Sequence, residues 1–133
     1  MARKPTIVVL AINAAARREP KAVERFLESV ERLKRAQVTG KRVTEATQVQ
    51  RAALKQLLDR AHAAVAESGR EPTADVIRRL TATALGAAAD RQGRSDLRQG
   101  RLTREYGAPG FGIFADVPRL RLVVSRRRRG GND

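Results

Sequence analysis

The chain contains neither cysteine nor tryptophan, and its only histidine is His62. Without cysteine it can form no disulfide framework and no thiolate metal site. A lone histidine also lacks the partners that a zinc site or a nucleophilic triad requires. We therefore expect a protein with no catalytic residues, no metal and no cofactor, that is, a protein that is not an enzyme.

Aromatic side chains are scarce, at 3% of the 133 residues. Phe26 is one of them, and all the others fall within residues 100–114, which are also rich in glycine. Because the rest of the interior has to be built from leucine, valine, isoleucine and alanine, large side chains are needed to fill it. We expect this stretch to fold back and plug an alanine-rich core, the alternative being a loop that stacks on bases. The side chains expected in the plug are Leu102, Phe111, Ile113 and Phe114.

Acidic residues are outnumbered, since 14 aspartates and glutamates stand against 28 lysines and arginines, which gives a net charge of +14. A chain with such an excess associates with polyanions, and nucleic acid is the foremost of these. A GC-rich genome also supplies many arginines and alanines, so the excess has a second explanation, and the composition does not decide between the two.

Long hydrophobic runs are also missing. The apolar residues 7–12 are followed by Asn13, Arg17 and Arg18, so this run is too short for a signal peptide and far too short to cross a bilayer. We expect a cytoplasmic protein without a membrane partner.

What the chain does contain is helical periodicity. Its apolar residues recur every three or four positions, and Gly40 and Gly69 stand where helix C-termini are expected. The β-branched start of the first segment would also suit a buried strand, but the alanines that follow favour a helix. The spacing predicts helices over residues 6–18, 20–37, 44–68 and 73–88. The expected fold is all-α, a small helical bundle of about four helices.

Acidic residues line one side of the second predicted helix. Glu28 precedes Arg32 and Glu31 precedes Arg35 by four residues, which is the order typical of surface ion pairs. Together with Glu24 these carboxylates offer oxygen ligands for a metal. Because each has a basic neighbour within a turn, we interpret them as a paired, solvated face.

After residue 90 the helical signal weakens. Gly93 and Gly100 bracket a segment in which Ser95 would cap a short helix. We expect residues 1–115 to form the helical domain with the aromatic loop packed on it, and residues 116–133 to form a basic, extended arm that is disordered when free.

The basic clusters are the candidate phosphate contacts. A cationic arm neutralises phosphates and releases counterions without needing precise geometry, so it adds affinity with little sequence specificity. Arg91, Arg94, Arg98, Arg101 and Arg104 recur at helical spacing, although the two glycines argue against one continuous helix and a solvated surface is the alternative. The residues expected to contact nucleic acid are Lys41, Arg42, Arg98, Arg101, Arg104, Arg119, Arg121, Arg126, Arg127, Arg128 and Arg129.

Several segments, in order, resemble an uncharacterised family of alanine- and arginine-rich helical proteins from high-GC bacteria. They are Arg3-Lys-Pro-Thr6, Ser68-Gly-Arg-Glu-Pro-Thr73, Arg79-Leu-Thr-Ala-Thr83, Leu97-Arg-Gln-Gly-Arg-Leu-Thr-Arg104 and Gly110-Phe111. The resemblance implies a helical fold, a helix for the first segment, and further sequence before the first of these segments. It implies no activity. This chain has Val9 and Leu10 where the family tends to show an aromatic residue.

The leading hypothesis is a non-enzymatic protein that binds nucleic acid by electrostatic contact with phosphates, with DNA slightly favoured over structured RNA. The alternative is a helical protein-interaction or oligomerisation module, in which the first helix offers its apolar surface to another chain.

Overall fold

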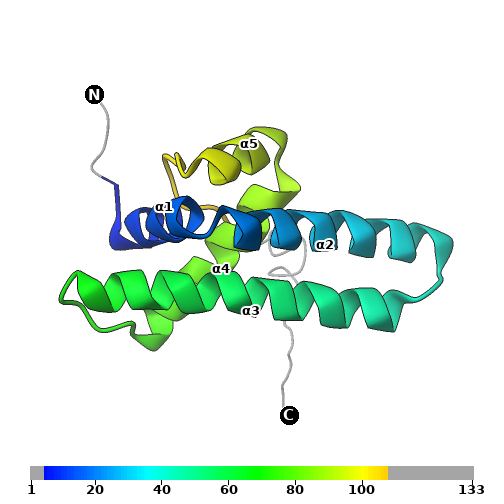
Figure 1. The fold of residues 1–133 in the computed structure, drawn as a ribbon, viewed down its shortest axis with the longest axis horizontal. Coiled ribbons are helices and arrows are strands. Elements are labelled where there is room, and N and C mark those ends of the chain that lie inside the picture. Colours follow the sequence, from blue (N-terminus) through cyan, green and yellow to red (C-terminus); the bar gives the residue numbers. More distant parts are fainter. Residues whose placement is uncertain (1–4, 108–133) are drawn as a thin grey trace, which may run out of the picture.

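The computed structural model describes residues 5–107 of the chain, and within them it contains five α-helices and no strand. The all-α prediction is therefore confirmed, and the fifth helix lies where the sequence suggests a short helix after residue 90 (Figure 1). The helices are α1 (Ile7–Arg18), α2 (Pro20–Thr39), α3 (Val43–Glu67), α4 (Ala74–Ala89) and α5 (Arg91–Gln99).

The long helix α3 runs antiparallel to α1 and α2, which lie nearly end to end along it (Figure 1). A single residue, Glu19, separates α1 from α2, and Pro20 starts α2 with the backbone angle that a first helical turn needs. Gly40 ends α2 in the left-handed conformation (φ 72°), as its position in the sequence predicts. The far end of the α2–α3 hairpin projects beyond the body that α1, α4 and α5 complete.

The core is built around α1. Val8, Val9 and Ile12 are fully buried, and so are the alanines Ala15 and Ala16 beside them. Small side chains let the neighbouring helices approach α1 closely on several sides, where a strand would leave backbone groups unpaired. The main chain of residues 7–9 is thus helical, and the strand alternative is excluded. The largest buried partners are Phe26, Leu27, Leu57, Leu80 and Leu97.

The segment that follows α5 packs back on this core, as part of the expected plug. Leu102 is buried, with 4% of its surface exposed, and Tyr106 is half-buried against the same cluster. Phe111, Ile113 and Phe114 lie outside the described residues, and so does the expected arm, residues 116–133.

The helix α5 differs from expectation at its start. Asp90 caps it, because the Asp90 carboxylate accepts a hydrogen bond from the backbone N–H of Gly93 (2.8 Å), and Ser95 lies inside the helix. Gly93 does not break the helix: a Cβ at this position would lie 2.6 Å from the carbonyl oxygen of Ala87, so glycine is needed where α5 turns tightly back on α4. Gly100 does end α5, in the left-handed conformation (φ 65°).

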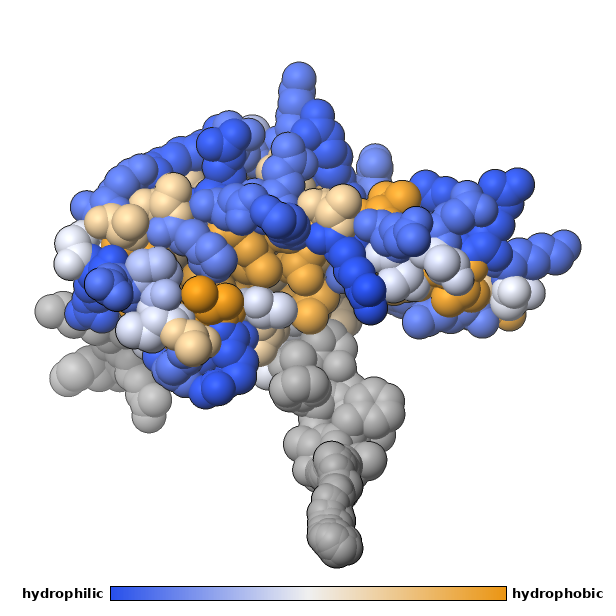
Figure 2. Space-filling model, turned by 90° about the horizontal axis from the view of Figure 1, so that it is seen from below, coloured by the Kyte–Doolittle hydropathy of each residue, from blue (hydrophilic) through white to orange (hydrophobic). Residues whose placement is uncertain are grey.

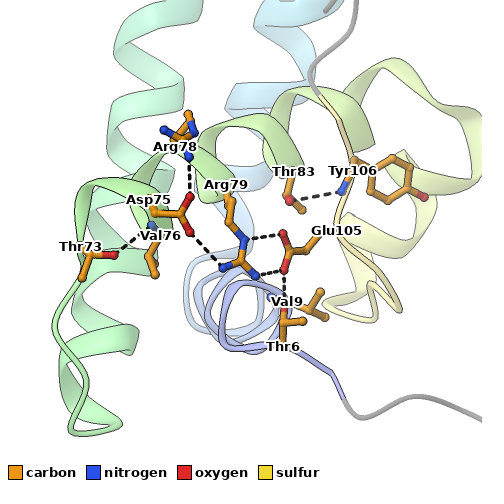
Figure 3. A network of polar contacts seen from close by, with 10 residues as sticks. All are labelled: Thr6, Val9, Thr73, Asp75, Val76, Arg78, Arg79, Thr83, Glu105 and Tyr106. Atoms are coloured by element: carbon orange, nitrogen blue, oxygen red, sulfur yellow. Dashed lines mark hydrogen bonds and ion pairs between the residues drawn. The ribbon is translucent and has the colours of Figure 1, made fainter. Parts of the chain in front are cut away.

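A polar network fixes residues 101–107 across α4 (Figure 3). The Arg79 guanidinium donates two hydrogen bonds to the Glu105 carboxylate, one of them 2.9 Å from Nε to Oε1, and also contacts Asp75. The hydroxyl of Thr6, the N-cap of α1, donates to Glu105 at 2.6 Å. Since these bonds stabilise the charged carboxylate, Arg79 above all holds the pKa of Glu105 below its usual value. One carboxylate therefore joins α4, the start of α1 and the segment after α5.

Candidate nucleic-acid interface

Arginines from two helices meet in a groove between α2 and α5. The groove has a volume of about 460 Å³, which is within the range of ligand-binding clefts. Its apolar floor is Leu27, and the carboxylates of Glu28 and Glu31 lie among the cations. We call it the arginine groove. Its arginines are Arg32 and Arg35 on α2 and Arg94 and Arg98 on α5.

Burial of the opposite face of α2 sets the position of its two arginines. Phe26 is fully buried on that face, which turns Arg32 and Arg35 outward along the groove, and Leu27 is buried beneath them as its floor. Both side chains are exposed, and among residues 5–107 no ion pair or hydrogen bond engages either guanidinium. These two cations are therefore available to a ligand.

The cations of α5 are held more firmly. Leu97 is fully buried and the close approach of Gly93 to Ala87 fixes the helix in place. Arg98 Nε lies 3.2 Å from Glu24 Oε2, so this arginine is paired with a carboxylate of α2. Arg94 Nη1 donates to the carbonyl oxygen of Ala88 at 3.2 Å, which ties the guanidinium to the C-terminal end of α4.

A carboxylate organises the middle of the groove. Glu31 Oε2 is buried and accepts no hydrogen bond within the described part of the chain, yet it lies 3.5 Å from Lys34 Nζ and 3.9 Å from Arg94 Nη1. It therefore holds two cations close together by charge. With Lys34 counted, five cationic side chains meet the carboxylates of Glu24, Glu28 and Glu31, so the groove keeps a positive excess. Guanidinium groups bind phosphate oxygens with two parallel hydrogen bonds, and this arrangement suits an anion.

The structure places the other predicted contacts elsewhere. Lys41 and Arg42 lie at the turn of the α2–α3 hairpin, at the end remote from α5 (Figure 1), and Arg42 pairs with Glu45 at 3.6 Å. Arg101 and Arg104 are exposed beyond the end of α5, so they do not continue its arginine stripe. The remaining predicted contacts, Arg119, Arg121, Arg126, Arg127, Arg128 and Arg129, lie outside the described residues.

Arg104 has a local role. Its guanidinium carbon lies 3.9 Å from the centre of the Tyr106 ring, a cation–π contact. The hydroxyl of Tyr106 donates weakly to Asp90 (3.4 Å), and burial raises the pKa of this phenol. The side chain of Arg104 thus covers the half-buried ring of Tyr106, and it does not line the arginine groove with Arg98.

Of the arginines in this groove, sequence spacing singled out Arg94 and Arg98 in the stripe of residues 91–104, with Arg98 among the expected contacts, and missed Arg32 and Arg35. It assigned these two to ion pairs with Glu28 and Glu31, but the closest cations to Glu31 are Lys34 and Arg94. The signal available was the spacing of Arg32 and Arg35 by one helical turn, but sequence spacing alone does not identify α5 as the facing helix.

Other kinds of site find little support in residues 5–107. No three acidic, histidine or cysteine side chains there come close enough to hold a metal ion. His62 is half-buried on α3, as a boundary histidine. None of the described helices has the length and the apolar character needed to cross a bilayer.

The molecule is a small all-α protein with a basic interhelical groove, and comparison with known proteins adds no relative. No family model, no curated protein and no solved structure matches the chain. The function has to be inferred from the groove itself.

Proposed function

We propose that this protein binds nucleic acid without catalysing a reaction, through contacts with phosphates, and that the arginine groove is the main contact of the described body. The observation that carries the proposal is the juxtaposition of Arg32 and Arg35 on α2 with Arg94 and Arg98 on α5. Residues 66 positions apart in the chain converge here on one cleft, and the two arginines of α2 have no partner among residues 5–107.

The proposed ligand is a phosphate backbone, and duplex DNA is the preferred form. A binder of unpaired bases stacks them on exposed aromatic rings. In residues 5–107 the aromatic side chains are Phe26, which is fully buried, and Tyr106, which is half-buried under Arg104. Contacts to phosphates alone carry no sequence information, so we expect binding with little sequence preference.

Matched charge removal tests the groove. The double variant Arg32→Gln/Arg35→Gln removes two cations from it, and Arg51→Gln/Arg70→Gln removes two exposed cations from α3 and the loop after it. Affinity for duplex DNA is measured at several salt concentrations. Each lost phosphate contact lowers the slope of log affinity against log salt by about 0.9, so the groove variant should lose about 2 and the control almost nothing.

Two results would contradict the proposal. If the groove variant and the control lose equal affinity and equal salt slope, binding depends on net charge and not on the groove. If the parent binds duplex DNA, structured RNA and heparin equally well, it has no specificity for nucleic acid.

The alternative is an oligomerisation surface on α1, and this helix exposes little apolar surface for it. The apolar side chains of α1 are mostly buried within the chain, and what this helix leaves at the surface is Leu10, which is 51% exposed, with Ile7 and Ala14 half-buried beside it. Apolar patches this small are normal on monomers. Light scattering over a range of concentrations distinguishes the two proposals, since a stable oligomer that Leu10→Gln dissociates would favour the alternative.

A further inference from the structure

A second groove, lined mainly by apolar side chains, lies on the other side of α2. It has a volume of about 550 Å³ and is bounded by α2, α3 and α4. Hydrophobic surface also gathers in the middle of the face that Figure 2 shows. We call this cleft the apolar groove. It is lined by Val30, Leu33, Lys34, Gln37, Gln50, Leu85 and Ala89.

Its lining favours an apolar occupant. Val30 and Leu85 belong to the half-buried hydrophobic residues that pack against the core, and Leu33 is half-buried beside them. Leaving such a cleft to water forfeits the hydrophobic stabilisation that an occupant would supply, and clefts of this size and character are typical binding sites.

The described residues end on α4, against Gly86, which is a close sequence neighbour of two residues that line this groove. Residues 105–107 step along α4 toward its C-terminal end: Glu105 binds Arg79, the backbone N–H of Tyr106 donates to Thr83 Oγ1 (3.3 Å), and Gly107 lies against Gly86. The contact at Gly86 is so close that a Cβ there would lie 2.3 Å from the Gly107 carbonyl oxygen. Leu85 and Ala89, which line the groove, are one residue before and three residues after Gly86.

The next residues have the composition to fill it. Phe111, Ile113 and Phe114 follow within seven positions of Gly107, and the intervening residues include glycines that permit sharp turns. Four residues reach up to about 13 Å when extended and seven reach about 24 Å, whereas adjacent turns of α4 are about 5.4 Å apart. Reach is therefore ample.

We propose that Phe111, Ile113 and Phe114 dock in the apolar groove of their own chain. The groove has the volume to hold them, the contact of Gly107 with Gly86 brings the chain to α4 beside the groove, and these three residues have the apolar side chains to fill it. A same-chain occupant has the further advantage that its effective concentration is high without any partner.

Lys34 lines the apolar groove and pairs with Glu31, which lines the arginine groove, so the two grooves are neighbours across this ion pair. The docking itself does not depend on the proposed function, and its test needs no nucleic acid.

Because the chain has no tryptophan, the fluorescence of a single introduced tryptophan reports on one position alone. In the full chain, Phe114→Trp introduces the only indole. We expect its emission to be shifted to the blue, protected from acrylamide, and unchanged on 100-fold dilution. Leu33→Gln, added to this background, should shift the emission to the red, and Gln50→Glu gives a second test from the α3 wall. Ile77→Gln, a half-exposed position of α4 outside the groove, should leave the emission unchanged.

Three results would overturn the proposal. A water-exposed emission in the parent reporter means that the segment does not dock. A red shift on dilution means that the occupant is a second copy. An unchanged emission in both groove variants, with helical content retained by circular dichroism, means that the ring docks elsewhere.

Discussion

Asn13 of α1 and Leu102, 89 residues further along the chain, exchange two hydrogen bonds. The Asn13 amide Nδ2 donates to the Leu102 carbonyl oxygen at 3.0 Å, and the Leu102 backbone N–H donates to Asn13 Oδ1 at 2.8 Å. The asparagine thereby pairs with an irregular segment as a neighbouring strand would. This explains a buried polar residue in the middle of the most apolar helix, since one residue supplies partners for both its amide nitrogen and its amide oxygen.

Replacing this asparagine should be costly. Asn13→Ala leaves both backbone groups of the buried Leu102 without partners, and each unsatisfied group costs about 1–3 kcal/mol. We expect the free energy of unfolding to fall by about 2–4 kcal/mol in urea titrations. Gln99→Ala, at an exposed position near the same segment, is the control and should change it by less than about 0.5 kcal/mol. A loss below about 1 kcal/mol in Asn13→Ala would show that the pair is dispensable.

The lowered pKa of Glu105 predicts an acid-sensitive contact. Because the folded pKa lies below the usual value of 4.5, the stabilisation is complete above about pH 5 and is lost as pH falls through the folded pKa. Glu105→Gln should lower the melting temperature at pH 7 and flatten its decline as the pH falls below 5. Glu71→Gln, an exposed carboxylate outside the network, should leave the decline as it is. Identical acid profiles for the parent and Glu105→Gln would contradict the network.

Because residue 107 packs closely against Gly86, we expect alanine to be harmful at Gly86 and harmless at Gly107. Glycine to alanine inside a helix normally stabilises by about 1 kcal/mol, but here the added methyl would meet backbone of residue 107 at 2.3 Å. Overpacking against main chain costs about 1–3 kcal/mol, so the clash prevails and Gly86→Ala should destabilise. Gly107→Ala, whose added methyl meets nothing within 4 Å, should be neutral in thermal unfolding. Stabilisation by Gly86→Ala would mean that the segment does not cross there.

Removal of the arginine cluster tests the arm. A chain that ends at Ser125 loses Arg126, Arg127, Arg128 and Arg129. If all four contact phosphates, the slope of log affinity against log salt should fall by about 3 to 4, since each contact contributes about 0.9. Equal slopes for the two chains, measured on the same duplex, would show that Arg126 to Arg129 make no contacts with phosphates.

Local signals predicted most of the fold. Residues that follow Thr6 and Thr73 are helical because these threonines cap them, and Gly40 ends a helix because it adopts a left-handed conformation without strain. Such features depend on near neighbours in the sequence. Gly93 was misread for the opposite reason: its glycine is required by Ala87 of the preceding helix, a tertiary contact that propensity cannot reveal.

The candidate site was predicted only in part, and for a similar reason. Arg98 was found from its spacing within one helix, whereas Arg32 looked like half of a surface ion pair with Glu28. Both interpretations concern neighbours on one helix. A groove between helices depends on how α5 packs against α2, and this follows from Leu97, buried at 0% exposure, and from the close turn at Gly93.

The central place of α1 also has a consequence for synthesis. Translation makes this helix well before Leu97 and Leu102, which complete its burial and lie near the end of the described residues. At about 5–20 residues per second, the 89 positions between Asn13 and Leu102 correspond to about 4–18 s. For that time the nascent chain carries an apolar helix without its last partners, so α1 is the element that needs protection in the cell until residues 97–102 have been made.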